Sequence, residues 1–465
     1  MYPEIPESER FPLLTPRGRE LLYRMRQHPH APLWNWPNGE QLDAVGLECV
    51  QQFAQRQRAA SKVQPPGSDS CEAGRPEWVD ALVDYVAETV PFYRNRAQVV
   101  GLANWRFEQI PSCSREDLAP RVWDFVPDDQ SLDQLIIFST SGTTGHPARM
   151  PSHPATAACG VPLMESVLQQ AGIDFPRGPE VVALTNVVAY RGAFTTAIVI
   201  AYLEEAGCVR VNLHPDAWRK DGDCPKYLNE WAAPIWLGDP MALAAMENIE
   251  IARPPQAILS SILQLTPTQA GRLSRRYGCP VFDLYALTEV GILGVSTQYG
   301  HENQIRHEIV PHDVYVEILG EDDRPLPDGV RGEIAVTCRR NPYMPLLRYR
   351  TGDFAALSHR QGRIALLDLE GRQPVSFPLP SGRIVHSMEV TRMMRHHAVV
   401  QYRLHQDENG HFAFGYRGLL DIGQLKSELS ELLEQPAALR FEELPAPEGR
   451  RIKVRQYSSD FVHMT

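Results

Sequence analysis

The sequence predicts an α/β fold, with a large N-terminal domain of layered sheets and helices and a small C-terminal α+β domain. Three observations lead to this prediction. The chain has 465 residues, of which 43% are apolar and 22% charged, and because a domain usually takes roughly 100–200 residues, it can form two or three. From about residue 130, short apolar runs alternate with helical patterns. Residues 373–465 then follow a pattern of their own.

Residues 1–100 are expected to be mainly helical. Pro16 can begin one helix, and a later helical pattern covers Trp78–Val90. The stretch 61–76 is polar and contains clusters of proline and glycine, which indicates a loop. We expect residues 1–75 to pack as a helical layer, with a cover over a ligand pocket and a dimer contact as the alternatives.

Five apolar runs after this segment are candidate buried strands. They occupy 135–138, 180–185, 234–238, 257–261 and 280–286. Helical patterns separate the later runs, and such alternation predicts a sheet covered by helices.

Two further stretches predict β-hairpins. At 314–338, two strand-like runs flank a turn rich in Asp, Pro and Gly. In the tail, 399–418 repeats this arrangement, and 425–435 is predicted to be a short amphipathic helix. The tail is therefore expected to form a compact α+β unit.

Charge and cysteine content exclude several classes of protein. With 46 basic and 57 acidic residues the net charge is −11, which argues against a nucleic-acid polymer or an anionic membrane as the main partner. The closest two of eight cysteines, Cys208 and Cys224, lie 16 positions apart, so there is no CxxC pair, and scattered thiols fit a reducing compartment. No stretch resembles a secretory signal or a membrane span. We expect a cytoplasmic protein.

The segment 139–145, Ser-Thr-Ser-Gly-Thr-Thr-Gly, directly follows an apolar run. Glycines allow backbone amides to turn towards an anion, and hydroxyl groups add further donors. No lysine follows the last glycine, so this is not the GxxxxGK[ST] loop. The segment predicts a phosphate site, with a plain Ser/Gly loop as the alternative.

Two more segments add to this site. Tyr285–Glu289 places a hydroxyl and a carboxylate at the end of a predicted strand, where ligands of α/β proteins bind. Arg348–Asp353 combines two guanidinium groups, which can hold phosphate, with a carboxylate that can accept both ribose hydroxyls. Each segment alone is also typical of a solvated turn. Together, and in this order, they predict a nucleotide site.

These three segments resemble the motifs of acyl- and aryl-adenylate-forming enzymes, and the branch of phenylacetate–coenzyme A ligase is the most similar. Residues 88–96 and 111–120 are similar to N-terminal motifs of that branch, and 370–372 lies where its interdomain hinge lies. The resemblance runs from about residue 80 to the end. It implies an adenylate-forming domain over 1–372 and a lid domain over 373–465.

The resemblance implies ATP-dependent, AMP-forming activation of a carboxylic acid, favouring an aryl acid, followed by transfer to a thiol. ATP, Mg²⁺ and coenzyme A are the expected cofactor and co-substrates, and a small carboxylic acid is the partner, with a homodimer left open. Two alternatives remain. The acceptor is an amine or hydroxyl of a biosynthetic pathway, or the chain is a degenerate relative that binds nucleotide with little turnover.

The resemblance also assigns residues to this chemistry. The β- and γ-phosphates would be held by Ser141, Gly142, Thr143, Thr144 and Gly145. Thr288 would contact the α-phosphate, and Glu289 would ligate Mg²⁺. The residues around the nucleoside would be Tyr285 stacked near adenine, Ala286 beside it, Asp353 on the ribose hydroxyls and Arg372 near the hinge.

Several positions depart from the family pattern. His146 and Arg149 stand where a lysine often follows the phosphate loop, and 260–264 replaces a Gly-x-Glu segment on the adenine side. Ala286 stands where glycine is usual, and Pro374, after Gln373, can stiffen a hinge that lacks its acid.

A further departure lies near the C-terminus. Arg450 takes the place of a lysine that, in the family, bridges the carboxylate and the α-phosphate. Arginine keeps the charge but changes the geometry. We hypothesise that Arg450 or the nearby Lys453 takes over this role.

The acid pocket is expected around the helix that follows 186–194 in the family and around residues after the Thr-Glu pair. Its candidate residues are Tyr190, Arg191, Gly192, Phe194, Ile292 and Leu293. Aromatic and aliphatic walls favour an apolar acid, and Arg191 is expected to be a surface residue rather than a ligand.

Some relatives hold a structural zinc ion near His301, His307, His312 and Cys338. These spacings are loose for an ion that needs four well-placed ligands. We expect solvated histidines, with zinc as the alternative. His396 and His397 are expected on the surface of a helix.

Overall fold

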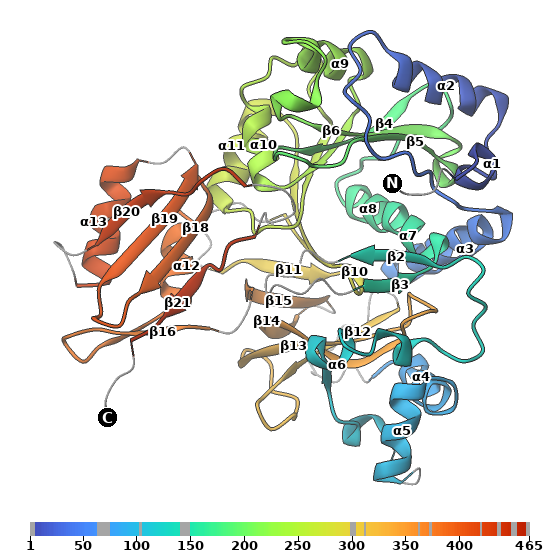
Figure 1. The fold of residues 1–465 in the computed structure, drawn as a ribbon. Coiled ribbons are helices and arrows are strands. Elements are labelled where there is room, and N and C mark those ends of the chain that lie inside the picture. The colour runs from blue at the N-terminus through green and yellow to red at the C-terminus, as the bar shows by residue number, and fades with distance from the viewer. Residues whose placement is uncertain are drawn as a thin grey trace.

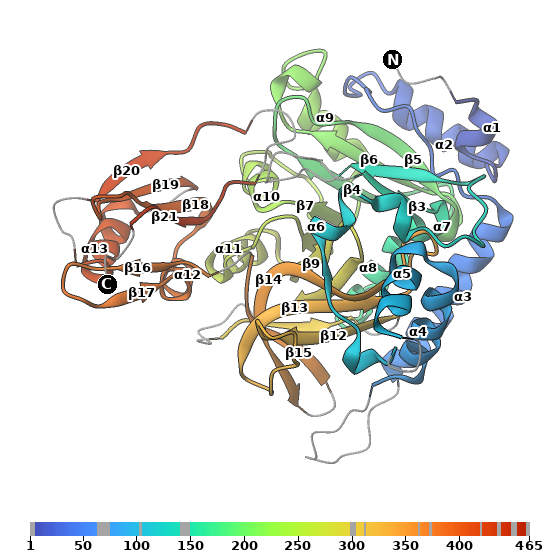
Figure 2. The same ribbon diagram turned by 60° about the horizontal axis from the view of Figure 1, so that its bottom comes forward.

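The computed structural model describes residues 5–62, 75–101, 105–139, 149–297, 304–310, 313–360, 363–371, 374–418, 421–434, 439–447 and 453–461. It confirms the α/β fold class. A large layered domain carries the main sheet, and a smaller C-terminal domain of strands and helices lies to one side of it in both views (Figures 1 and 2). The predicted boundary between residues 372 and 373 falls outside the described residues and stays a prediction.

Within the described residues, the main sheet has 13 strands in the order β12-β13-β14-β15-β11-β10-β9-β8-β7-β4-β6-β5, with β1 (Cys113–Ser114) paired to β14. Its parallel part is formed by β4 (Val182–Val188), β6 (Ala206–Asn212), β7 (Ile235–Gly238), β8 (Ala257–Ser260) and β9 (Val281–Leu287). Four of the five predicted strands are confirmed here. Their apolar, β-branched residues suit strands buried on both faces.

The antiparallel part of the sheet continues from β9. Its strands are β10 (Gly291–Ser296), β11 (Arg306–Ile309), β12 (Val314–Leu319), β13 (Arg331–Cys338), β14 (Leu346–Arg360) and β15 (Arg363–Glu370). The hairpin predicted over 314–338 is confirmed, since β12 pairs with β13 from Val314 opposite Cys338.

The fifth predicted strand is exposed rather than buried. β2 (Ile136–Ser139) pairs with β3 (Arg149–Ser152) as a separate two-stranded ribbon. Ile137 and Phe138 are 46% and 41% exposed, because a ribbon of two strands has no second layer over these side chains.

Helices of the large domain cover the sheet, as predicted. They are α1 (Glu7–Arg10), α2 (Pro16–Gln27), α3 (Ala44–Lys62), α4 (Glu77–Thr89), α5 (Pro91–Val100), α6 (Arg115–Leu118), α7 (Pro154–Ala158), α8 (Gly160–Gln169), α9 (Asp223–Trp231), α10 (Pro240–Met246) and α11 (Pro267–Tyr277). The N-terminal segment packs as a layer: Leu21, Leu22 and Met25 of α2 are buried in one cluster with Val209 and Val211 of β6 (Figure 1).

One expected helix is a strand. Residues after Phe194 form β5 (Thr196–Ile200), antiparallel to β6. Threonine, isoleucine and valine dominate this stretch, and β-branched side chains favour strands. The N-terminal segment lies over it, with Arg26 of α2 donating to the carbonyl of Ala197 at 2.9 Å.

The C-terminal domain has its own sheet and core. β16 (Ser376–Pro378) pairs with β17 (Ile384–His386), and a four-stranded sheet contains β18 (Val399–Gln406), β19 (Phe412–Gly418), β20 (Arg440–Glu443) and β21 (Tyr457–Ser459). α12 (Ser387–Met394) and α13 (Ile422–Leu432) pack against it. The predicted hairpin and helix of the tail are confirmed. None of the helices described is long and apolar enough to cross a membrane.

Candidate active site

A cavity of about 190 Å³ lies where the C-terminal edge of β8 and β9 meets the C-terminal domain. Its walls come from residues 262–264 and 283–287, from His307, from Asp353, Leu369 and Gly371, and from Lys453, Val454 and Gln456. This is the edge of a parallel sheet at which α/β proteins bind ligands.

The predicted nucleoside residues come together in this cavity. Tyr285 at the end of β9 donates its hydroxyl to Asp353 Oδ2 over 2.9 Å. Burial, together with the Asp353 carboxylate, raises the pKa of Tyr285 well above its ordinary value, so the phenol stays protonated. Two features of the turn direct the Asp353 carboxylate into the cavity. Gly352 has φ +79°, and the Asp353 amide donates a 3.1 Å hydrogen bond to Thr351 Oγ1. Ala286 lines the same wall.

Residues 262–264 of the adenine-side segment 260–264 also line the cavity, although the segment lacks the glycine of the family pattern. Ile262 has φ +78°, a left-handed conformation that is strained for a β-branched residue. Strained backbone of this kind concentrates at ligand sites. The segment therefore keeps the backbone shape of a glycine-bearing turn without the glycine.

Thr288 and Glu289 lie in the turn between β9 and β10. Thr288 is exposed, whereas the Glu289 side chain is only 8% exposed and its Oε1 is 3.7 Å from an Arg115 nitrogen. Tyr349 donates its hydroxyl to the same oxygen over 3.2 Å. Burial and the Glu289 charge raise the pKa of Tyr349 above its ordinary range, so its hydroxyl remains a donor.

Sequence reasoning did not assign Arg115 to the site. The pairing of β1 (Cys113–Ser114) alongside β14, with Ser114 opposite Arg350, brings Arg115 to the strand that carries Asp353. In the sequence, the segment 111–120 resembles a family motif, and the available signal for Arg115 is a basic residue at the start of a helix.

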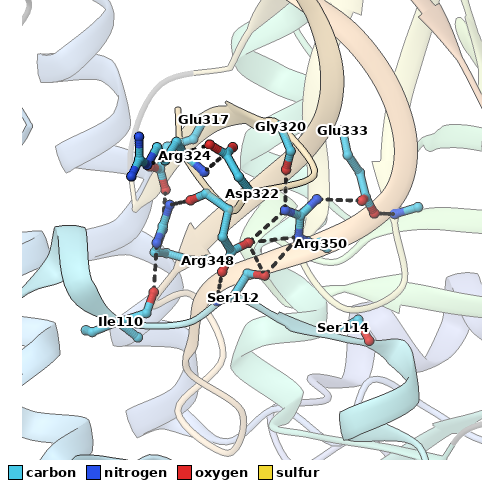
Figure 3. Close-up of polar contacts among 12 residues, drawn as sticks. Ile110, Ser112, Ser114, Glu317, Gly320, Asp322, Arg324, Glu333, Arg348 and Arg350 are labelled. Carbon is cyan, nitrogen blue, oxygen red and sulfur yellow. Dashed lines mark hydrogen bonds and ion pairs between the residues drawn. The ribbon is translucent and has the colours of Figure 1, made fainter. Parts of the chain in front are cut away.

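The two arginines of the Arg348–Asp353 segment do not face the cavity, so their interpretation as phosphate ligands is wrong. Arg348 is buried and donates to the carbonyl of Ile110 at 2.7 Å (Figure 3). Arg350 pairs with Asp323 and Glu333, each at 2.7 Å. Both guanidinium groups fix the N-terminal segment onto the 314–338 hairpin, which leaves them no free donor edge for a ligand.

Lys453 reaches the cavity from the C-terminal domain. Val454 and Gln456 line the cavity with it, and the Gln456 carbonyl accepts a 2.7 Å bond from the Leu404 amide of β18. Arg450, Arg372 and Gln373 lie outside the described residues. Of the two cations proposed to replace the family lysine, Lys453 is thus the one whose place is described.

The phosphate-loop residues Ser141, Gly142, Thr143, Thr144 and Gly145 also lie outside the described residues, as does His146. Their flanks are described: Ser139 of β2 pairs with Arg149 of β3. The predicted phosphate loop therefore joins the two strands of the β2–β3 ribbon.

A family model for AMP-binding enzymes matches residues 95–340. The chain belongs to the AMP-binding enzyme family. No curated protein sequence matches it. Among solved structures, 2-hydroxyisobutyryl-CoA ligase in the postadenylation state with 2-HIB-AMP is similar with a TM-score of 0.60 at 15% identity, over 85% of this chain and 94% of that chain. The same ligase with 2-HIB-AMP and CoA in the thioesterification state gives a TM-score of 0.50 at 16% identity, again over 85% and 94%.

In this AMP-binding enzyme, the six predicted acid-pocket residues are not gathered in one place. Tyr190 packs with Val188, Ala193, Met241 and Val400. Ile292 and Leu293 belong to two other core clusters.

The remaining acid-pocket residues lie near the start of β5. Arg191 is 70% exposed and is 3.4 Å from Asp216, and Gly192 has φ +76°. The Arg210 guanidinium lies over the Phe194 ring, 3.9 Å from its centroid, and the centroids of the Phe194 and Trp36 rings are 5.5 Å apart. The expected helix would supply one wall of the acid pocket. Because β5 lies in its place, the described residues do not form that wall.

The expected solvated histidines are a second correction. His307 is 1% exposed, lines the cavity and lies 3.2 Å from the Asp283 carboxylate. Cys338 is on β13, and His301 and His312 lie outside the described residues. Among the residues that are described, no group of three metal-binding side chains is present. His307 could have been found from strand alternation, since it lies between the polar Arg306 and Glu308.

His397 is also buried rather than on a helix surface. It follows the end of α12, pairs with Glu428 at 2.8 Å, and its carbonyl accepts a 3.1 Å bond from Thr266 Oγ1 of the large domain. Next to it, Arg395 forms a buried 2.8 Å ion pair with Asp368. These contacts dock the C-terminal domain beside the cavity.

Proposed function

We propose that this AMP-binding enzyme is an ATP-dependent, AMP-forming acid ligase that converts a carboxylic acid into an acyl adenylate and passes the acyl group to coenzyme A. One observation carries the proposal: a single cavity unites Tyr285 and Asp353 of the large domain with Lys453 of the C-terminal domain. An aromatic ring can stack on a base, a carboxylate can accept hydrogen bonds from ribose hydroxyls, and a cation can pair with a phosphate.

In the first half-reaction, the carboxylate oxygen of the acid attacks the α-phosphorus of ATP. A new oxygen–phosphorus bond forms, the bond to the bridging oxygen breaks, and pyrophosphate leaves. Negative charge on the phosphate oxygens must be stabilised by fixed donors and cations. We assign this role to Lys453, Thr288 and the loop 141–145, with Asp353 holding the ribose. Arg450 and Arg372 would complete the set.

Glu289 suits the Mg²⁺ that this reaction uses. Its carboxylate is a hard oxygen donor, and within the described residues both of its contacts go to Oε1, which leaves Oε2 for an ion. Magnesium is typically bound by one or two carboxylates together with substrate phosphates. When bound, it neutralises charge on the phosphates.

In the second half-reaction, the acceptor thiolate attacks the acyl carbon and AMP leaves. The fold is shared with a ligase whose structure holds an acyl adenylate and CoA, which supports coenzyme A as acceptor. We propose an aryl acid as substrate, as in the phenylacetate–coenzyme A ligase branch, on the strength of the sequence motifs. We further propose that the protein acts in the cytoplasm.

Release of pyrophosphate from ATP across a panel of aryl acids tests the proposal. We expect release that depends on the acid, and a thioester when coenzyme A is added. If pyrophosphate release depends on the acid but no thioester forms, and an amide or ester forms when an amine or alcohol is supplied, then the acceptor is that amine or alcohol and not coenzyme A. If ATP binds tightly but no acid causes release of pyrophosphate, the proposal of a ligase is contradicted, and a relative that binds nucleotide with little turnover is favoured.

A further inference from the structure

A polar row crosses an otherwise apolar face of the main sheet near its C-terminal edge. Arg210 of β6 lies opposite Thr196 of β5 and opposite Asn186 of β4, so these three side chains share one face. The next row on this face is apolar, with Cys208 opposite Ile198 and both packed against one hydrophobic cluster. Arg210 Nε and Thr196 Oγ1 are buried and have no hydrogen-bond partner in the described chain. Buried polar atoms of this kind cost free energy unless a ligand satisfies them.

Within the described residues, Arg210 carries a charge that no ion pair neutralises. Its guanidinium lies over the Phe194 ring, 3.9 Å from the ring centroid. Stacking of this kind covers a face of the planar group and leaves its N–H edge for hydrogen bonds. Burial lowers the pKa of Arg210, as expected for a cation that has lost part of its hydration without gaining a carboxylate partner.

The groups around Arg210 compensate its charge only in part. The Tyr190 hydroxyl and the Asp239 carboxylate both favour the charged form of Arg210. Asp239 Oδ1 accepts bonds of 2.8 and 3.0 Å from two amides at the start of α10, and its Oδ2 is buried with no hydrogen-bond partner in the part of the chain that is described. Burial raises the pKa of Asp239, which disfavours its negative charge. An anion from a ligand can therefore complete the pairing of the guanidinium.

The same face of the sheet connects Arg210 with the nucleotide cavity. Leu237 of β7 lies opposite Asn186, and Leu237 and Ala286 pack against the same hydrophobic cluster as Cys208. Ala286 also lines the cavity. In the strand order β9-β8-β7-β4-β6, four interstrand spacings separate the two ends of this path, roughly 19 Å between backbones. A ligand that reaches both ends must be elongated.

We propose that Arg210 determines the class of acid that this enzyme activates: it binds the distal carboxylate of an elongated aryl dicarboxylic acid whose reacting carboxylate lies beside Lys453. This inference rests on the proposed function, because it takes the acid to be adenylated in the cavity. A guanidinium binds a carboxylate through two parallel N–H···O bonds, and Thr196 and Asn186 add hydrogen-bonding groups in the same row. An uncharged end of the same length would leave the buried charge unpaired.

A length series of matched acids tests the proposal in wild type. The acids are benzoates with a para-alkyl chain of increasing length, each ending either in a carboxylate or in the neutral carboxamide of the same shape. We expect kcat/KM for acid-dependent pyrophosphate release to favour the carboxylate by about tenfold or more once the chain is long enough. The shortest pair should show no such preference, because its distal carboxylate does not reach Arg210.

Arg210→Gln should bring the ratio of kcat/KM for the carboxylate and the carboxamide close to one, because glutamine is polar but uncharged. Its activity on the carboxamide acids should change little, which also shows that the variant is folded. Arg210→Lys keeps the charge but not the paired donors, so it should retain part of the preference. Arg219→Gln is the control, because Arg219 is an exposed arginine on the segment that follows β6, and it should leave the ratio unchanged.

Equal loss of activity on both members of a pair in Arg210→Gln would overturn the inference, since it would show that the stack with Phe194 is only structural. A raised KM for coenzyme A with unchanged acid selectivity would also overturn it, since the guanidinium would then bind the acceptor.

The absence of a preference for the carboxylate at every chain length in wild type would overturn the inference as well, while release of pyrophosphate with the carboxamide acids would leave the proposed function standing. If no acid causes release, the proposed function fails and this inference with it. The two failures are therefore distinguishable.

Discussion

At the scale of single residues, the candidate site depends on cations that come from separate parts of the chain. Lys453 belongs to the C-terminal domain, while Arg115 reaches Glu289 from the start of α6. The sequence already suggests Lys453 as a replacement for the family lysine, whereas it assigns no role to Arg115. Their charges must act at different points of the nucleotide, because one lines the nucleoside cavity and the other lies beside the predicted metal ligand.

Lys453→Ala is expected to lower the rate of adenylation by about 10²-fold or more, because the charge that develops on the α-phosphate loses a fixed cation. The KM for ATP should change much less, since ground-state binding is shared by many groups. Pyrophosphate release under saturating substrates measures the effect. Arg455→Ala, an exposed cation two residues away that does not line the cavity, is the control and should have little effect.

Arg115→Ala is expected to weaken ATP binding by roughly tenfold while AMP binding is nearly unchanged. The guanidinium lies near Glu289 and not in the nucleoside cavity, so it acts on the phosphates that AMP lacks. Titration with the two nucleotides measures this, and Arg121→Ala, whose guanidinium is 3.9 Å from Asp117 instead, is the control. A parallel loss of both affinities would show that Arg115 only supports the fold.

At the scale of elements, the carboxyl group of Glu40, a half-buried residue, ties the N-terminal segment to the turn that follows β5. Glu40 accepts a 2.9 Å bond from the Ala201 amide, and burial raises its pKa from 4.5 to about 7. A raised pKa means that the folded state binds the proton more tightly than the unfolded state does. This contribution to stability is complete below about pH 4.5 and is lost as the pH rises to about 7.

Glu40→Gln should therefore unfold at a higher temperature than wild type at pH 8, by an amount worth about 1–2 kcal/mol, and the two should converge towards pH 5. Thermal melts at both pH values measure the difference. Glu9→Gln, an exposed position of α1, should show no such pH dependence. A constant difference between Glu40→Gln and wild type at both pH values would contradict the assignment.

The elements also show what the sequence could and could not predict. β7, β8 and β9 were predictable because a short apolar run bounded by turn residues is local information. For β5, the family resemblance predicts a helix, although the residues themselves, from Thr196 to Ile200, favour a strand. The local preference was correct there, and the family pattern was wrong.

In the site, Tyr285 and Asp353 were predictable from motifs, but their 2.9 Å contact joins residues 68 positions apart. The Asp283–His307 contact, across β10, and the Arg115–Glu289 approach likewise depend on strand order. Strand order is set by packing over the whole chain, which no single segment encodes.

At the scale of the whole molecule, a buried ion pair fixes the C-terminal domain against the large one. Asp368 at the end of β15 lies 2.8 Å from Arg395, and both side chains are less than a tenth exposed. Thr268 Oγ1 reinforces the contact with a 2.7 Å bond to the Arg395 carbonyl. Breaking one partner of a buried pair leaves an uncompensated charge, at a cost of about 3–5 kcal/mol.

Asp368→Ala should therefore loosen the docked arrangement. We expect faster amide hydrogen exchange around 395–400, a larger radius of gyration in solution scattering, and slower pyrophosphate release. Arg383→Gln removes an exposed pair with Glu389 inside the C-terminal domain and should alter none of these. If amide hydrogen exchange around 395–400 is unchanged in Asp368→Ala, the remaining contacts between the two domains are sufficient to hold the C-terminal domain in place.

The cavity draws its walls from both domains, and this has a thermodynamic consequence. A ligand that binds only when both walls are present adds its binding free energy to the folded, docked state, by RT ln(1 + [L]/Kd). Unfolding of either domain then releases the nucleotide. Two cores that are separate in the chain would melt as one cooperative unit when the nucleotide is bound, and the nucleotide would act as a structural link between them.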